Sequence, residues 1–312
     1  MVDLRVSIGP LTLRNPVMVA AGTFGYGPEF AGAVRLDRLG ALITKTLTRQ
    51  PRAGNRPPRL AETPSGMLNA VGLHNIGLEA FVREQLPRLI AWRVPILVSV
   101  LGETPQDTAE MVAALDGEQG VAGMEINLSC PNLHREQNGR HVLMVAQDAE
   151  ETFRVIQAAR QRTRKPLVAK LSPDVTDVRP IAQAAERAGA DALSIGNTFA
   201  GMSFNPATRR SRLGAMTGGL SGPAIRPLAL YRVWYTAAAV RIPIIGVGGI
   251  VRAEDAVEFL LAGASAVAIG TATFADPRAA LHVVRGLERY LRRHRLDAVA
   301  GLRGAVSAPD FT

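Results

Sequence analysis

The stretch IPIIGVGGIVRAEDAVEFLLAGASAVAIGTA, residues 242–272, carries one complete unit of the fold. It begins with an apolar, β-branched run that ends in glycines, and it continues with helical spacing over 253–264. It ends in a second apolar run, 266–272. Continuous apolar runs are typical of parallel strands that are buried on both faces. The stretch therefore predicts a strand, a helix and a second, parallel strand.

The same unit recurs along the chain. Helical spacing also fills 149–162 and 178–189, between further runs of the same kind. Eight alternations predict an α/β fold, a (β/α)8 TIM barrel, with residues 1–312 as a single domain. The rival, a doubly wound open sheet, is disfavoured because no early G-x-G-x-x-G turn is present. The eight apolar runs are 16–22, 41–46, 95–102, 123–129, 166–172, 190–197, 242–249 and 266–272.

Composition narrows the class of protein. The hydrophobic content is 47%, the charged content is 20%, and no uncharged apolar stretch is long enough to span a membrane. The first residues lack the apolar core of a signal peptide, so we expect a cytoplasmic protein. The net charge of +9 is dispersed and aromatic residues make up 5%, which favours a basic enzyme over a nucleic-acid binder. A single cysteine excludes an internal disulfide and a Cys-ligated cluster held by this chain alone. The histidines show no metal-ligand spacing, so we expect no metal.

Lysine is rare and well placed. Of 36 basic side chains only Lys45, Lys165 and Lys170 are lysines. Lys165 lies in a turn, whereas Lys45 and Lys170 lie near strand ends, which is where barrel enzymes keep their chemistry. In a chain this rich in arginine, a lysine at such a position indicates that a compact ammonium is needed there in place of a planar guanidinium. Lys170 suits either a Schiff base or a fixed positive charge beside a flavin.

Glycines end the last two strands, in GVGGI (246–250) and IGTA (269–272). Glycine lets backbone N–H groups approach an anion, and the loops after strands seven and eight are a frequent phosphate site of barrels. Flavin mononucleotide (FMN), pyridoxal phosphate and a sugar phosphate all fit this pattern. GGLSG (218–222) adds further backbone donors.

Cys130 follows the fourth strand in NLSCPN (127–132), which is a position for a nucleophile or a general base. No histidine is placed to pair with it, so a Cys–His hydrolase is disfavoured. The asparagines at strand ends and in long loops offer donors and acceptors that suit a flat heterocycle. Three connections, 47–76, 130–146 and 199–222, are longer than a barrel needs, and we expect them to be extended βα loops over the active-site face. The asparagines are Asn69, Asn127, Asn132 and Asn197.

The chain resembles the class 1 dihydroorotate dehydrogenases over nearly its whole length, and most closely the B type, the catalytic subunit of the NAD-linked enzyme. ETPSGMLNAVGLHNIG (62–77) and SCPN (129–132) are the most specific matches. GVGG and GTA occur in many barrels and weigh less. Further matching stretches are NPVMVAAGTFGYG, ITKTLT, VAKLSP, GNTFAGM, TGGLSGPAIRP and ASAVAIGTA.

The resemblance implies that one FMN per chain oxidises (S)-dihydroorotate to orotate in de novo pyrimidine (UMP) biosynthesis. Cys130 would take the proton from carbon 5, and the hydride from carbon 6 would go to flavin N5. The implied substrate contacts are Lys45, Asn69, Ala70, Val71, Gly72, Leu73, Asn127, Asn132, Asn197 and Thr198. The implied FMN contacts are Ala21, Lys45, Thr46, Ser99, Asn127, Lys170, Gly196, Gly222, Gly248, Gly249, Gly270 and Thr271.

The sequence departs from the family pattern at several points. The loop 133–146 replaces a glycine-rich segment that usually ends in Phe-Gly. Ala21 and Ser99 stand where Ser and Asn are common, and Gly196 replaces a larger apolar residue.

The B type implies a partner subunit that carries FAD and a [2Fe-2S] cluster and passes electrons to NAD. We expect a homodimer of this chain within a heterotetramer of two catalytic and two electron-transfer chains. Alternatives are the A type, which reduces fumarate directly, the related core of dihydropyrimidine dehydrogenase, and a non-redox phosphate-binding lyase or isomerase that uses Lys170.

Overall fold

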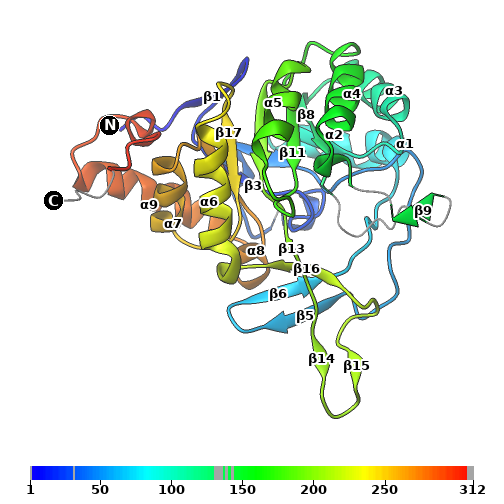
Figure 1. The fold of residues 1–312 in the computed structure, drawn as a ribbon. Helices are drawn as coiled ribbons and strands as arrows, with labels where there is room; N and C mark the ends of the chain where they lie inside the picture. Colours follow the sequence, from blue (N-terminus) through cyan, green and yellow to red (C-terminus); the bar gives the residue numbers. More distant parts are fainter. Residues whose placement is uncertain (1, 31, 130–135, 138–139, 142–143, 308–312) are drawn as a thin grey trace.

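Eight parallel strands close into a barrel in a computed structural model of the chain, which describes residues 2–30, 32–129, 136–137, 140–141 and 144–307 (Figure 1). The strands follow one another around the barrel in sequence order, and each predicted apolar run overlaps one of them; β8 begins two residues before the predicted run 123–129. The (β/α)8 prediction is confirmed. The barrel strands are β3 (Val17–Val19), β4 (Ala41–Ile43), β7 (Ile96–Val100), β8 (Val121–Asn127), β11 (Leu167–Leu171), β12 (Ala192–Ile195), β17 (Ile244–Val247) and β18 (Ala266–Ile269).

Helices surround the barrel (Figure 1). Thr104 and Asp148 cap two of them by accepting hydrogen bonds from backbone N–H groups of the first turn. The α-helical elements are α1 (Leu78–Ala80), η3 (Phe81–Gln85, a π-turn), α2 (Leu86–Ile90), α3 (Pro105–Asp116), α4 (Ala149–Arg160), α5 (Arg179–Arg187), α6 (Arg226–Ala237), α7 (Ala253–Leu261), α8 (Ala272–Ala275) and α9 (Ala279–Arg293). The short 3-10 helices are η1 (Pro28–Phe30), η2 (Leu36–Arg38), η4 (Val145–Gln147), η5 (Pro223–Ile225) and η6 (Val299–Leu302).

The first strand–helix unit differs from the expected alternation. Between β3 and β4 the described residues form only η1 and η2. Gly25 and Gly27 both have left-handed backbone conformations, with φ of 53° and 110°, and Pro28 follows them. A segment with such φ values cannot continue as a right-handed helix.

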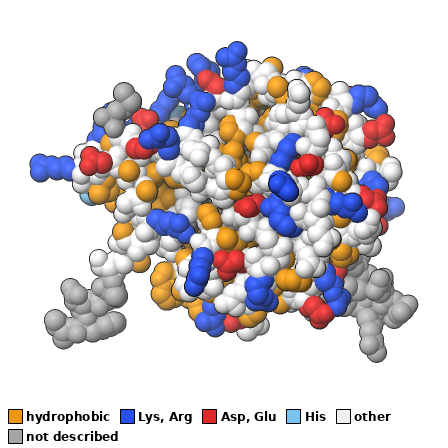
Figure 2. All heavy atoms as spheres, turned by 90° about the horizontal axis from the view of Figure 1, so that it is seen from above, with side chains coloured by type: hydrophobic (Ala, Val, Ile, Leu, Met, Phe, Trp, Pro, Cys, Tyr) orange, Lys and Arg blue, Asp and Glu red, His pale blue; other side chains and the backbone are white. Residues whose placement is uncertain are grey.

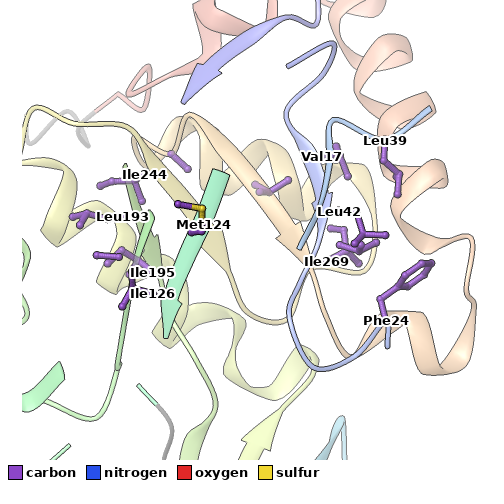
Figure 3. Packing of buried hydrophobic residues seen from close by; sticks show 14 of the residues in the cluster. Val17, Phe24, Leu39, Leu42, Met124, Ile126, Leu193, Ile195, Ile244 and Ile269 are labelled. Carbon is purple, nitrogen blue, oxygen red and sulfur yellow. The ribbon is translucent and has the colours of Figure 1, made fainter. Parts of the chain in front are cut away.

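The core has two layers because strand residues alternate between the barrel interior and its helix-covered face. Val17 and Val19 belong to the cluster that packs against the helices, and Met18 belongs to the interior cluster. Figure 3 shows Val17, Leu42 and Ile269 of neighbouring strands gathered near Leu39 and Phe24 in the outer layer. A hairpin of β1 (Val6–Ile8) and β2 (Leu11–Leu13) adds two buried side chains, Ile8 and Leu13, to the interior layer at the amino ends of the strands.

The long connections pair with one another in a second, antiparallel sheet. Its strand order is β13-β16-β6-β5, and it lies beside the barrel in Figure 1. The sequence interpretation treated these segments as loops, because strands of three or four residues rich in Gly and polar side chains lack a clear period. The strands are β5 (Leu60–Thr63), β6 (Gly66–Asn69), β13 (Phe199–Gly201) and β16 (Gly218–Ser221), and two short hairpins, β9 (Glu136–Gln137) with β10 (Arg140–His141) and β14 (Phe204–Asn205) with β15 (Arg210–Ser211), project further.

The surface carries basic and acidic side chains side by side. Figure 2 shows blue Lys and Arg side chains spread over one face, with red Asp and Glu side chains among them. No helix in the described part of the chain combines the length and the apolar character needed to cross a bilayer.

Candidate active site

Two adjoining hollows lie at the carboxyl ends of the barrel strands, beneath the second sheet. The first, which we call the asparagine hollow, has an empty volume of about 850 Å³, and the second, the glycine hollow, has one of about 560 Å³; both volumes include space that is open to solvent. Seven residues line both hollows, so the two spaces adjoin: Ala21, Thr23, Lys170, Asn197, Thr198, Ser221 and Thr271.

The structure brings most of the predicted site residues to this cavity. Ala70 and Ser99 do not line it, and Cys130 and Asn132 lie outside the described residues. The asparagine hollow contains Ala21, Lys45, Thr46, Asn69, Val71, Gly72, Leu73, Asn127, Lys170, Asn197, Thr198 and Thr271. The glycine hollow adds Gly196, Gly222, Gly248, Gly249 and Gly270.

Two ammonium groups face the cavity without a protein partner. Lys170 is only 5% exposed, yet it makes no hydrogen bond or ion pair with any residue that the structure describes. The Lys45 ammonium likewise has no such partner within the described ranges. Burial lowers the pKa of Lys45, and the positive charge of Arg59 lowers it further. Buried charges are normally paired, so both groups are placed to meet a negatively charged or strongly polar ligand.

The amide side chains are held in fixed orientations. Asn197 donates through Nδ2 to the carbonyl oxygen of Ser129 at 2.8 Å and to its hydroxyl at 2.9 Å. Asn127 Oδ1 accepts from Ser129 N and Oγ, both at 3.2 Å, and Asn127 Nδ2 donates to Thr46 Oγ1 at 3.0 Å. Ser129, which immediately precedes Cys130, is therefore fixed at the end of the fourth barrel strand.

The segment 69–73 is anchored by the second sheet and by a neighbouring loop. Asn69 ends β6 and donates to the carbonyl oxygen of Gly219 on β16 at 3.3 Å. Asn55 donates through its backbone to Val71 and through its side chain to Ala70, both at 3.0 Å. Ala70 is buried beneath the segment at 1% exposure, which explains why it does not reach the cavity.

The glycine hollow is built from tight turns after β17 and β18. Gly249 has a φ of 72°, and a Cβ there would lie 2.9 Å from the backbone nitrogen of Arg226. The buried Asp255 carboxylate accepts from the backbone N–H groups of Val251 at 2.8 Å and Arg252 at 3.0 Å, and it also binds the Arg226 side chain. These bonds hold the loop that follows the glycines. Backbone donors on a rigid, glycine-lined loop suit an anion such as a phosphate.

Ser99 does not face the ligand space as expected. Its side chain is fully buried one layer below, where it contacts Thr46 Oγ1 at 2.9 Å and donates to Glu125 Oε1 at 2.9 Å. The serine is one position deeper than a strand-end contact, and its hydroxyl is too short to pass Thr46.

Several cavity residues were missed from the sequence. Thr23 and Ser221 supply hydroxyl groups, and Ser221 accepts a hydrogen bond at 2.8 Å from Thr271, which was a predicted contact. Leu60, Met67 and Phe274 supply an apolar edge; Leu60 and Phe274 are 46% and 51% exposed. Glu125, which lies behind the cavity wall, could have been noticed in the sequence as an acid inside an apolar strand. No sequence pattern indicates the apolar edge, because it depends on the pairing of the second sheet. The described residues contain no group of three His, Cys, Asp or Glu side chains that could hold a metal.

The fold and the cavity define a barrel protein with a ligand site at the carboxyl ends of its strands, the arrangement of barrel enzymes. A family profile described as dihydroorotate dehydrogenase matches residues 3–291. The chain belongs to the dihydroorotate dehydrogenase family, a family of oxidoreductases, and the resemblance predicted from its motifs is confirmed.

The relatives indicate the type. A protein of Pelobacter propionicus named dihydroorotate dehydrogenase B (NAD(+)), catalytic subunit, is 50% identical over 304 residues, which cover 97% of this chain and 98% of the relative. Proteins with the same name from Citrifermentans bemidjiense and Desulforudis audaxviator are 48% and 49% identical over 304 and 305 residues, with 97% and 98% of this chain covered and 98% of each relative. The predicted similarity to the NAD-linked B type is confirmed.

Proposed function

We propose that this chain oxidises (S)-dihydroorotate to orotate in pyrimidine biosynthesis, with FMN bound in the cavity and electrons passed to NAD through a partner subunit. Membership of the family and the names of its relatives support the reaction. The observation that supports FMN binding is Lys170, which lines both hollows and is a buried ammonium without a partner in the described structure.

The chemistry of the cavity fits FMN. The glycine hollow offers the phosphate Gly222, Gly248, Gly249 and the strand-end Thr271. Because the two hollows adjoin, the ring of a cofactor whose phosphate lies in the glycine hollow would extend toward Lys170 and Asn127. A cation beside the pyrimidine half of a flavin stabilises its reduced, anionic form. Bound FMN would supply the acceptor for the hydride from carbon 6. We assign to it the cofactor residues that line the cavity, with Ser99 acting through Thr46.

The asparagine hollow suits the substrate. Lys45 would pair with the substrate carboxylate, and Asn69, Asn127 and Asn197 would hydrogen-bond the alternating N–H and C=O groups of its ring. The backbone of Val71, Gly72 and Leu73 and the residue Thr198 would complete the contacts, with Ala70 supporting the segment from below. Asn132, as a further contact, rests on the resemblance alone.

Cys130 is the proposed base that removes the proton from carbon 5. The support for this assignment is its position directly after Ser129, which Asn127 and Asn197 hold by four hydrogen bonds. A thiol has a reference pKa near about 8.5, so a positive neighbour such as a buried lysine would favour its reactive thiolate.

The assembly and the location belong to the same proposal. We propose that residues 1–312 form one FMN-binding domain, that the chain forms a homodimer, and that two copies join two electron-transfer subunits that carry FAD and a [2Fe-2S] cluster. The relatives' name, catalytic subunit, supports a partner chain. A cytoplasmic location fits pyrimidine biosynthesis.

Anaerobic mixing of the purified protein with dihydroorotate tests the proposal. We expect a yellow protein with the visible absorption bands of a flavin, and we expect dihydroorotate to bleach them. Rapid reoxidation by NAD should require the partner subunit. Reoxidation by fumarate without the partner would identify the A type instead, and a colourless protein that traps a carbonyl compound on Lys170 would identify a non-redox lyase.

The Cys130→Ser variant tests the base. It should bind FMN as the wild type does, while the rate of bleaching falls by about 10²- to 10⁴-fold, the usual contribution of a general base. Bleaching at the wild-type rate would refute the role of Cys130.

A further inference from the structure

A line of hydrogen bonds runs from the barrel interior to the wall of the cavity. Glu125 lies on β8 and its Oε1 accepts from Ser99 Oγ at 2.9 Å. Ser99 Oγ lies 2.9 Å from Thr46 Oγ1, which also accepts from Asn127 Nδ2 at 3.0 Å. Glu125 and Ser99 are fully buried, whereas Thr46 and Asn127 line the asparagine hollow. The acid is thus connected to the ligand space through two hydroxyl groups.

The direction of each bond follows from counting protons. Ser99 has one hydroxyl proton and donates it to Glu125, so Thr46 must donate to Ser99 in the contact between the two hydroxyls. The Asn127 amide cannot be turned over, because its Oδ1 accepts from the backbone N–H of Ser129. Thr46 Oγ1 has then given its proton to Ser99 and accepted one from Asn127. Only an acceptor site remains for the cavity.

Within the described part of the chain, the Glu125 side chain has no hydrogen-bond partner other than Ser99. It is 0% exposed, and its second carboxyl oxygen, Oε2, has no hydrogen-bond partner among the described residues. Its neighbour in the strand register on β11, Val168, belongs to the apolar interior layer. An unpartnered buried oxygen is costly, so a methionine or leucine would pack here at lower cost. Among the described residues, the one hydrogen bond of the carboxyl group leads through Ser99 to Thr46.

We propose that Glu125 is a positioning residue that acts through Ser99 to hold Thr46 as a fixed hydrogen-bond acceptor toward the cavity. The ligand group that matches is an N–H flanked by carbonyl groups. In an oxidised flavin ring the only N–H is at N3, between two carbonyls, so the acceptor selects the pyrimidine edge of FMN. Asn127 Nδ2 and the two lysines remain as donors for the neighbouring carbonyls. This inference rests on the proposed function and adds how the cofactor edge is selected.

A double-mutant cycle between Glu125→Met and Thr46→Val tests the proposal. Methionine matches the length of glutamate and cannot accept the bond from Ser99. The Thr46 proton is then able to turn toward the cavity, where it opposes the flavin N–H. We expect FMN, followed by quenching of its fluorescence, to bind about 2- to 10-fold more weakly, the value of one neutral hydrogen bond. Thr46→Val should weaken binding by a similar factor.

The interaction between the two changes distinguishes positioning from packing. If Glu125 acts through Thr46, the double variant should bind FMN no more weakly than Thr46→Val alone. The midpoint potential of bound FMN should shift in both single variants and shift no further in the double variant. The melting temperature of the FMN-free Glu125→Met protein should equal or exceed that of the wild type, because an unpartnered oxygen is removed.

Two further variants complete the experiment. Ser99→Ala interrupts the same line in its middle, and it carries the test if Glu125→Met fails to fold. Ser194→Ala is the control, because Ser194 is buried on β12 of the same barrel and its hydroxyl has no partner in the described structure. Wild-type FMN affinity in both Glu125→Met and Ser99→Ala, or effects of Glu125 and Thr46 that add fully, would overturn the inference. Failure of the wild type itself to bind FMN would instead overturn the proposed function.

Discussion

Replacement of Lys170 by methionine should raise the stability of the FMN-free protein and impair the reaction. Lys170 is 5% exposed and has no partner in the described structure, so the apo protein carries a desolvated charge that nothing compensates. Methionine fills the same space, and its burial is worth about 1.5–3 kcal/mol. Because the cavity is open to solvent, part of this cost is already relieved in the wild type, so we expect a net gain of about 1–2 kcal/mol. For 312 residues the melting temperature rises by about 1.5 °C per kcal/mol.

The loss in the loaded enzyme has the opposite sign. A unit charge about 4 Å from a developing negative charge contributes about 4 kcal/mol at an effective dielectric constant of about 20. Removing it should slow anaerobic flavin reduction by up to about 10³-fold. Scanning fluorimetry of the apo protein and stopped-flow absorbance measure the two effects.

Lys165 provides the matched control for this prediction. Its ammonium donates to the carbonyl oxygens of Glu118 at 2.9 Å and Leu115 at 3.3 Å. Lys165→Met should therefore lower the melting temperature and leave flavin reduction unchanged. If Lys170→Met lost stability as Lys165→Met does, and reduced its flavin at the wild-type rate, the reasoning about an unpartnered ammonium would be refuted.

Three further predictions concern the walls of the cavity. Asp255→Ala should lower the free energy of unfolding, measured in urea, by about 3–5 kcal/mol and weaken FMN binding, because it removes the buried acceptor of Arg226 and of two backbone N–H groups. Glu258→Ala removes an exposed partner of Arg226 at 3.5 Å and should cost less than about 1 kcal/mol. Equal costs of the two variants would count against a structural role of Asp255. Gly249→Ala should weaken FMN binding severalfold, because φ is 72° and the new Cβ would clash with Arg226. Gly301→Ala places its Cβ in open space and should leave the affinity unchanged. Equal FMN affinities of the two variants would contradict this prediction. Burial and Arg59 lower the pKa of Lys45 below its usual 10.5, so between the two values the unfolded chain binds more protons at this group than the folded protein does. The free energy of unfolding should therefore rise with pH between the lowered pKa and 10.5. The KM for dihydroorotate should rise on the alkaline side as Lys45 loses its charge, and Arg59→Gln should move that rise to higher pH; an unchanged profile would exclude Lys45 as the carboxylate partner.

The barrel could be predicted because each of its strands is indicated by a short, local sequence pattern. Ile244–Val247 and Ala266–Ile269 are continuous apolar runs, and such runs favour buried parallel strands whatever surrounds them. The strand-end rule then placed Lys170 and Asn127 correctly at the cavity. Local pattern and global fold agree at these positions.

The remaining parts depend on contacts between distant segments. Gly218–Ser221 pairs with Gly66–Asn69 across about 150 residues, and neither segment has an apolar period that announces a strand. The family resemblance implied a flavin contact for Ser99, but Thr46 lies between Ser99 and the cavity, and the sequence does not show that arrangement. Glu125 lies within the predicted strand 123–129, and its contact with Ser99 joins two different strands, which a local pattern does not show.

The second sheet also makes its two insertions, which carry β5–β6 and β13–β16, structurally dependent on each other. β6 is flanked by β5 from its own insertion and by β16 from the other, and Asn69, Met67 and Ser221 reach the cavity only in that arrangement. Deleting either insertion would expose the unsatisfied backbone edge of the survivor to other chains. A designer who transplants this site to another scaffold must therefore move both insertions together.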